Sequence, residues 1–190
     1  MQVTRETTCL TGHLLIAMPA MADPNFARSV TYLCEHTEQG ALGIIINRPM
    51  DMALGEVFRQ LALEPVVPAV AEQPVLRGGP VQTERGFVLH EPAGPWDSTV
   101  EVSDFVHLTT SQDILAAMAR GAGPGRALMA LGYAGWAAGQ REMEIGANAW
   151  LSVPATAALL FETPFEARWA AAAGLLGINL ATMSPEAGHA

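Results

Sequence analysis

Two strand-length apolar runs joined by a short link place the tightest limit on how this chain can fold. The runs are SVTYLCEH and LGIIINRP, the link between them is TEQGA, and a third run, HLLIAMP, lies upstream. A short link with a glycine suits a hairpin, whereas parallel strands need a crossover of about a dozen residues or more. A purely parallel sheet is therefore disfavoured. Pro49 is expected to end the second run, because proline cannot donate a hydrogen bond to a strand ladder.

The rest of the chain alternates strand and helix patterns. Residues 54–61 repeat apolar side chains at helical spacing and predict a short helix, and the Pro-rich segment 63–74 predicts a packed loop. TTSQDILAAMARG predicts a helix that Thr110 caps and Gly121 ends. A further helix is predicted over GWAAGQREMEIGAN. Strands are predicted in PVLRGGPV, GFVLHEP, TVEVSDFVHLTT, RALMALGYAGW and AWLSVP.

The segment TPFEARWAAAAGLLG predicts a helix near the C-terminal end of the sequence. Thr163 is expected to cap it, Pro164 to occupy its first position and Gly177 to follow its last turn. One side of this helix is expected to dock on the core through Phe165, Trp169 and Leu176.

Length and composition predict one domain over residues 1–190. Half of the residues are hydrophobic and 15% are charged, which is typical of a globular protein. We find no internal repeat or polar linker. No apolar run approaches the ~18 residues of a membrane span, so no membrane partner is expected. Two cysteines, Cys9 and Cys34, are too few for a disulfide scaffold, and they favour a reducing compartment such as the cytoplasm.

The charge of the chain excludes several kinds of chemistry. It has ten arginines, no lysine and a formal net charge of −9. Without lysine it cannot form a Walker-type phosphate loop or a Schiff base. The arginines are scattered along the sequence, so direct nucleic-acid binding is not expected.

Cys34 and His36 form one candidate site. In a regular strand they point to the same side, with Glu35 on the other, so an imidazolium beside Cys34 could activate its thiol. The alternative is that Cys34 is a small buried hydrophobe and His36 a polar strand end. Because Val30 and Tyr32 share their side, we expect Cys34 to be buried and His36 to lie near the rim, within reach of solvent.

Other constellations are weaker. A metal site would require His13, His90 or His107 to converge with another ligand, and the spacing offers no paired ligands, so we predict neither a metal nor a cofactor. The glycine clusters RGGP (77–80) and GYAGWAAG (132–139) could present backbone amides to an anion, although turn geometry explains them equally well. No serine has the Gly-x-Ser-x-Gly context of a hydrolase.

The ordered segments of the chain resemble one family of bacterial proteins. LTGHLLIAMPAMADPNFARSVTYLCEH, GIIINRP, GGPVQTERGFVLH, VSDFVHLTTSQDIL, ALGYAGWAAGQ, NAWLSVPAT and LLFETPFEARW occur in the order and spacing of the YqgE/AlgH family. The resemblance covers Leu10 to about Leu176, which is then the core of the domain. It implies an α+β fold: a single compact domain with a curved, largely antiparallel or mixed sheet and flanking helices, in the bacterial cytoplasm.

The resemblance also implies a function and a set of positions. Members are commonly described as transcriptional regulators, and no reaction is attached to the family. We therefore expect a regulatory protein that acts through a protein or small-ligand partner. A thiol-dependent enzyme or redox sensor centred on Cys34 is the alternative. The candidate functional residues, which match the family pattern or adjoin it, are Cys34, His36, Asn47, Arg48, Gly78, Gly79, Gly132, Gly135 and Trp136.

Overall fold

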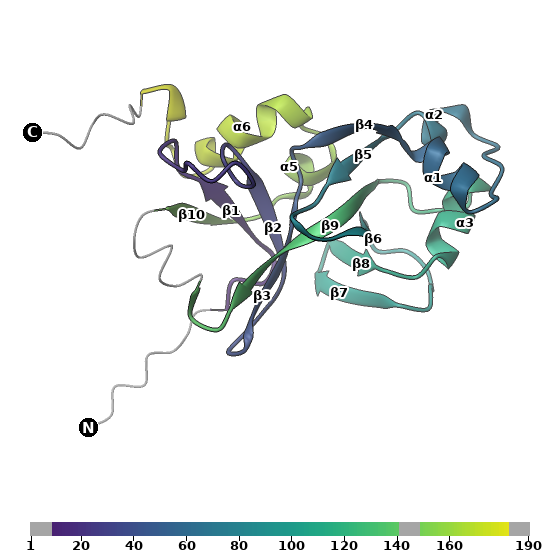
Figure 1. Cartoon of the computed structure of the whole chain (residues 1–190), viewed down its shortest axis with the longest axis horizontal. Coiled ribbons are helices and arrows are strands. Elements are labelled where there is room, and N and C mark those ends of the chain that lie inside the picture. Colours follow the sequence, from purple (N-terminus) through teal and green to yellow (C-terminus); the bar gives the residue numbers. More distant parts are fainter. Residues whose placement is uncertain (1–8, 141–148, 183–190) are drawn as a thin grey trace, which may run out of the picture.

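The strands of the protein form one strongly curled sheet, a half-barrel of the α+β class. The computed structural model describes residues 9–140 and 149–182, and within them the sheet has ten strands (Figure 1). Its main path runs β10-β1-β2-β3-β9-β6-β8-β7, with antiparallel neighbours throughout. β5 pairs in parallel with β9, and β4 pairs with β5. The sheet is thus mixed and largely antiparallel, as predicted.

The strands and helices have the following bounds. The strands are β1 His13–Ala17, β2 Val30–Thr37, β3 Gly40–Ile45, β4 Pro49–Ala53, β5 Pro74–Arg77, β6 Val81–His90, β7 Thr99–Ser103, β8 Val106–Thr109, β9 Ala127–Ala137 and β10 Trp150–Pro154. The helices are α1 Leu54–Gln60, α2 Pro68–Ala71, α3 Asp113–Ala119, α5 Ala157–Phe161 and α6 Arg168–Gly174, with 3-10 turns at Phe165–Ala167 and Leu180–Thr182.

The predicted hairpin is confirmed. β2 and β3 pair antiparallel, and Thr37 lies opposite Gly40 across the turn. The prediction that Pro49 ends the strand LGIIINRP was wrong. β3 stops at Ile45, and Pro49 is the first residue of β4. Asn47 terminates the pairing earlier, because its side-chain oxygen accepts the amide of Val30.

Two of the helices predicted in the middle of the chain, α1 and α3, are present, but the loop between β4 and β5 and the start of α3 differ from the prediction. α1 is confirmed, and the Glu56 carboxylate accepts the amide of Ala53 before its first turn. The predicted loop 63–74 contains the single-turn helix α2. α3 begins at Asp113 without a cap from Thr110, whereas Gly121 follows it with the left-handed φ of +75° that was predicted.

The predicted C-terminal helix is split. Thr156 caps the unpredicted helix α5, accepting the amide of Leu159, and α6 starts only at Arg168, after a 3-10 turn. Trp169 docks as expected, and its indole N–H donates to the carbonyl of Ala17 at 2.8 Å. Leu176 is 41% exposed, so its predicted docking was wrong. The helix predicted over GWAAGQREMEIGAN was wrong at its start, since β9 runs to Ala137, and its residues 141–148 lie outside the described residues.

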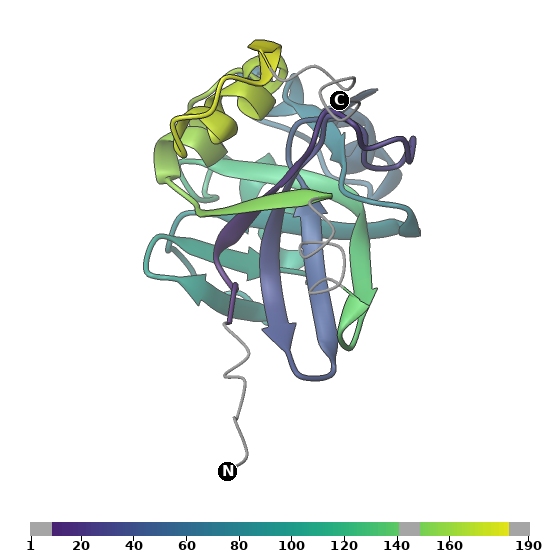
Figure 2. The same ribbon diagram turned by 90° about the vertical axis from the view of Figure 1, so that its left-hand side faces the viewer.

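Buried residues lie on both faces of the curled sheet, and Figure 2 shows α5 and α6 at its upper end. One face packs beneath α5 and α6 and contributes Tyr32, Ile44, Phe87 and Leu160 to the largest cluster of buried residues. The opposite face is buried at one end under α1 and α3, and at the other end around Trp136 and Trp150. The Tyr32 side of β2 faces a core, as expected, and Leu33 is fully buried on the other side, so β2 is buried on both sides.

The chain after β5 passes directly against the backbone of β9. A Cβ atom on Gly78 would lie 2.3 Å from the carbonyl oxygen of Gly132, and one on Gly79 would lie 2.1 Å from the carbonyl carbon of Tyr133. In the other direction, a Cβ on Gly132, whose φ is +79°, would lie 2.5 Å from the carbonyl oxygen of Gly79. Only glycine fits such an approach. We call this contact the glycine crossing: Gly78, Gly79 and Gly132.

Replacing Gly78 by alanine should strongly destabilise the fold. The new methyl group meets backbone atoms of β9, which cannot rotate away, so we expect a loss of about 3 kcal/mol or more in the free energy of unfolding, measured by urea denaturation. Gly174→Ala in α6 is the matched control, since nothing lies within 4 Å of its added Cβ. That helical change should be neutral or stabilising by about 0.5–1 kcal/mol. Equal stability of the two variants would contradict this account of the crossing.

Candidate functional site

The pairing of Cys34 with His36 does not occur. The register of β2 against β3 shifts between Leu33 and Glu35, so Cys34 is a bulge with no partner of its own. Beyond the bulge, His36 lies opposite Ala41, which packs on the Trp136 side of the sheet, whereas Cys34 packs on the Tyr32 side. The prediction that they share a face was therefore wrong, because one inserted residue reverses the alternation.

Cys34 is buried, as predicted, and its environment suppresses reactivity. Its side chain is 5% exposed, and its thiol points to the carbonyl of Tyr32 at 3.7 Å. Burial, together with the nearby Glu35 charge, raises the pKa of the Cys34 thiol far above its ordinary value. A reactive cysteine needs the opposite shift. The alternative of a thiol enzyme centred on Cys34 is thus not supported.

His36 has a structural role. It is 7% exposed, so the prediction that its ring lies near the rim was wrong. Its Nδ1 accepts the amide of Leu10 at 3.0 Å, and its own amide donates to the hydroxyl of Thr11 at 3.1 Å. These bonds fasten the segment before β1 against the end of β2, which explains its burial.

Asn47 and Arg48 hold the loop between β1 and β2. The side-chain Nδ2 of Asn47 donates to the carbonyl of Arg28 at 2.8 Å. The Arg48 guanidinium donates to the carbonyls of Asn25 and Ala27. The Asn47 side chain is thus bonded to backbone through both its nitrogen and its oxygen, since the oxygen accepts the amide of Val30. Arg48 also borders a surface cavity together with Arg77.

The remaining candidates are glycines and one tryptophan. Gly78, Gly79 and Gly132 form the glycine crossing, and the amide of Gly78 is already bonded to the carbonyl of Leu131, which leaves it unavailable to an anion. Gly135 has room for a Cβ, with Tyr133 3.4 Å away. Trp136 is buried edge-on against Trp150, with ring centroids 6.0 Å apart.

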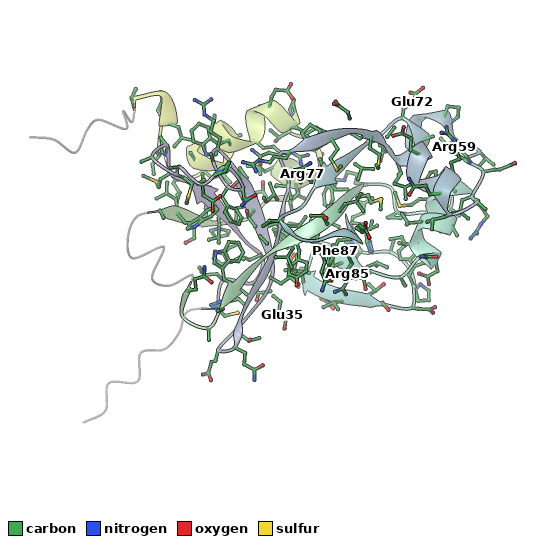
Figure 3. All side chains as sticks on the ribbon, viewed as in Figure 1. Glu35, Arg59, Glu72, Arg77, Arg85 and Phe87 are labelled. Atoms are coloured by element: carbon green, nitrogen blue, oxygen red, sulfur yellow. The ribbon has the colours of Figure 1, made fainter. Side chains whose placement is uncertain are left out.

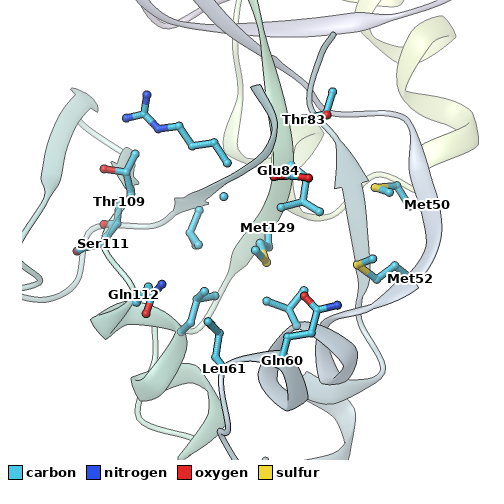
Figure 4. Close-up of a pocket in the computed structure, with 17 residues that line it drawn as sticks. Met50, Met52, Gln60, Leu61, Thr83, Glu84, Thr109, Ser111, Gln112 and Met129 are labelled. Atoms are coloured by element: carbon cyan, nitrogen blue, oxygen red, sulfur yellow. The ribbon is translucent and has the colours of Figure 1, made fainter. Parts of the chain in front are cut away.

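A cavity that none of these candidate residues lines lies between β4, α1, α3 and the sheet. It has a volume of about 720 Å³ (Figure 4). Met50 and Met52 line one wall from β4, and Met129 lines the floor from β9. Other apolar lining residues are Val57, Leu61, Val88, Leu115 and Leu131. We call this cavity the methionine pocket.

One wall of the methionine pocket is an excursion of β6. Between Val81, opposite Tyr133, and Gly86, opposite Leu131, β6 advances five residues while β9 advances two. Residues 82–85 therefore form an irregular excursion within β6, starting at Gln82 with its positive φ of +46°. Thr83, Glu84 and Arg85 of this excursion, all exposed, line the cavity.

Polar side chains border the opening. Gln60 comes from α1, Glu84 from the β6 excursion and Gln112 from the residue before α3, and all three are exposed (Figure 4). Within the described part of the chain these three side chains make no hydrogen bond or ion pair, whereas Ser111 is bonded to Asp113 at 2.5 Å. An apolar floor with unengaged polar groups at the rim is the usual arrangement of a small-molecule site.

Behind the pocket lies a buried polar chain. His90 has no exposed surface, and its Nδ1–H donates to the carbonyl of Glu91 at 2.7 Å, so its Nε2 accepts from the Thr109 hydroxyl at 2.7 Å. Burial, and secondarily the charge of His107, hold the pKa of His90 below its ordinary value of 6.5, against the opposing effect of its bond to Glu91. This histidine is neutral in the folded protein at neutral pH and supports the pocket wall through Thr109.

Within 9–140 and 149–182, no three His, Cys, Asp or Glu side chains are grouped so that they could hold a metal ion. In the same ranges, no helix is both long and apolar enough to cross a membrane.

Comparison with known proteins identifies the family. The model of the AlgH-like family, DUF179, matches residues 14–181. The chain belongs to the AlgH-like family. Among its relatives are UPF0301 proteins of Saccharophagus degradans, 54% identical over 97% of this chain and 91% of the relative, and Thioalkalivibrio sulfidiphilus, 57% identical over 95% and 96%. The predicted resemblance is thereby confirmed.

Solved structures of the AlgH-like fold agree with this description. The solution structure of AlgH from Pseudomonas aeruginosa is 51% identical, covers all of both chains and superimposes with a TM-score of 0.78. A crystal structure of protein DIP2367 from Corynebacterium diphtheriae is 22% identical, covers 82% of this chain and 80% of its own, and has a TM-score of 0.63. At that identity the second likeness concerns the fold alone.

Cys34 should react with iodoacetamide much more slowly than the exposed Cys9 in the native protein. Burial keeps the Cys34 thiol protonated and inaccessible, and unfolding in urea should make the two rates similar. Mass spectrometry of peptides from timed labelling provides the measurement. Cys34→Ala should cost about 1–2 kcal/mol of stability and retain the fold. Equal labelling rates in the native state would contradict this prediction.

His90 should make stability fall as the pH drops below about 6.5. The unfolded chain binds a proton near that pH, whereas folded His90 binds one only at lower pH, so protonation favours unfolding until the folded pKa is passed. His90→Gln should lower stability at pH 7.5, through lost hydrogen bonds, yet lose less of it between pH 7.5 and 5 than the unmodified protein does. Urea unfolding at several pH values measures the difference, in which the other histidines cancel. An unchanged slope in His90→Gln would refute the assignment.

Proposed function

We propose that the protein is a cytoplasmic regulatory protein that binds a small amphipathic molecule in the methionine pocket and acts on gene expression through a partner protein. The observation that carries this proposal is the pocket itself, a cavity of about 720 Å³ lined from β4, α1, α3, β6, β8 and β9. Its volume lies within the range of about 300–1,000 Å³ that small-molecule sites occupy.

The lining indicates the class of ligand. Three methionines present flexible, polarizable thioethers, which adapt to apolar groups of irregular shape. Gln60, Glu84 and Gln112 at the rim offer both donors and acceptors to a polar end group. A molecule with an apolar body and one polar end would use both features.

The lining favours binding over a reaction. Among the described residues that border the cavity, Thr109 is the one bonded to a histidine, and it is fully buried. Its hydroxyl is directed to His90 instead of toward a ligand. A nucleophilic mechanism would need that oxygen exposed to the cavity.

The charge supports a partner-mediated route to expression. With a net charge of −9, the chain as a whole repels the phosphate backbone of DNA. Sequence-specific DNA binding at nanomolar concentration and physiological salt, in a filter-binding titration, would contradict this part of the proposal.

An amphipathic probe should occupy the methionine pocket. We expect 8-anilinonaphthalene-1-sulfonate to shift the ¹³C-methyl NMR signals of Met50, Met52 and Met129 saturably, while Met21, which packs on the Trp136 side, stays unchanged. Leu61→Trp should fill the cavity from a partly buried position. We expect it to lower the affinity for the probe about tenfold, because the probe then buries less apolar surface in the cavity.

The control variant is Leu175→Trp, at an exposed position beyond α6. It should bind the probe like the unmodified protein, and circular dichroism should show that both variants are folded. Equal affinity in Leu61→Trp and the unmodified protein, or shifts at Met21 as large as at Met52, would refute binding in the pocket.

A further inference from the structure

Four of the ten arginines converge on the segment between β3 and β4. Arg48 belongs to this segment. The carbonyl of Arg28 accepts from Asn47, the amide of Arg77 donates to the carbonyl of Arg48 at 2.8 Å, and the Arg168 guanidinium donates to the carbonyl of Ile46 at 2.6 Å. The arginines that are scattered in the sequence are thus partly gathered by the fold.

Two of these four cations lie over aromatic rings. Arg28 lies over the ring of Trp169, 5.4 Å from its centroid. Arg168 is almost fully buried, lies over Phe165 and also donates to the carbonyl of Thr163 at 2.9 Å. The buried Arg168 guanidinium is not available to a ligand in solution, whereas Arg28 is exposed but does not line the cavity that the other two arginines border.

The other two cations border a surface cavity of about 730 Å³. Its lining consists of Asn47, Arg48, Pro49, Met50, Asp51 and Arg77. The Arg48 guanidinium is half-buried and is fixed by the carbonyls of Asn25 and Ala27. The Arg77 side chain is exposed and has no hydrogen bond or ion pair within the described residues.

The two guanidinium groups are close enough to influence each other. Burial, and then the charge of Arg77, lower the pKa of Arg48, while Asp23 opposes the shift. Asp51 is the one carboxylate among the described residues that line the cavity. Asp51 and Asp23 offset part of this positive charge, and the exposed Arg77 guanidinium, which has no ion pair within the described residues, is left for an anion to neutralise.

We propose that Arg48 and Arg77 form a binding site for a phosphoryl group, presented by a phosphate monoester or by free phosphate. Guanidinium groups donate paired hydrogen bonds to phosphate oxygens, and two of them match the charge of about −1.5 to −2 of a phosphoryl group near pH 7. Arg48 is held in advance by two carbonyls, so little of its freedom is lost on binding.

This site is distinct from the methionine pocket and does not depend on the proposed function. The two cavities share Met50 as a lining residue, but Arg48 and Arg77 line only the second cavity. Asp51 lies on β4 beside Met50, and its carboxylate repels an anion in the cavity.

NMR titration of the arginine side-chain signals with inorganic phosphate and with AMP tests the site at an ionic strength of ~0.15 M. We expect saturable binding that Arg77→Gln weakens by about tenfold or more, the loss of one charge-assisted partner. Asp51→Asn should tighten binding, because it removes the repelling carboxylate. AMP binding tighter than phosphate supports a monoester as the ligand, and equal affinities support free phosphate.

Arg59→Gln is the matched control, since Arg59 lies on α1 at the helical end of the molecule and Arg77 on β5 near its centre (Figure 3). It should leave the affinity for phosphate unchanged. All three variants alter side chains at or near the surface, and their unfolding curves show that they fold. Binding that does not saturate at millimolar phosphate, or that Arg59→Gln weakens as much as Arg77→Gln, overturns the proposal.

Discussion

The glycine crossing is the contact on which the rest of the structure depends. Because the chain after β5 lies directly on β9, β9 can pair with β3 along one half and with β5 along the other, and the sheet curls where the partners exchange. The same contact begins the excursion of β6, since Gly132 leaves room for the backbone of Val81 and Thr83. The methionine pocket and the arginine pair are both placed by this arrangement, one on each side of β4.

Local sequence signals predicted the parts of the fold that local geometry controls. The hairpin of β2 and β3 follows from a link too short for any other connection, and the burial of Cys34 follows from the apolar residues that share its side. The resemblance to a family supplied the curved, mixed sheet, which periodicity could not. These predictions needed only neighbouring residues or a whole-chain match.

The errors and omissions have a common cause in contacts between distant segments. His36 was misplaced because a bulge at Cys34 is a property of two paired strands, and period-two alternation cannot reveal it. Thr163 was predicted to cap a helix because the residues after it have the pattern of a helix start. The capped helix is instead α5, which lies earlier in the chain and is capped by Thr156. The methionine pocket is lined from β4, α1, α3, β6 and β9 together, and the polar QTER run inside a strand pattern was its one local hint.

Residues of strand β4 line both the methionine pocket and the cavity of Arg48 and Arg77, so binding in one can affect binding in the other. Among the described strands β4 pairs with β5 alone, by a register that is irregular between Pro49 and Ala53, and its Met50 lines both cavities. If a molecule in one cavity displaces Met50, the shape of the other cavity changes with it. The two sites would then be linked, and each occupant would alter the affinity for the other by the same factor. Such reciprocity would let a protein of this size compare two chemical signals without any moving domain.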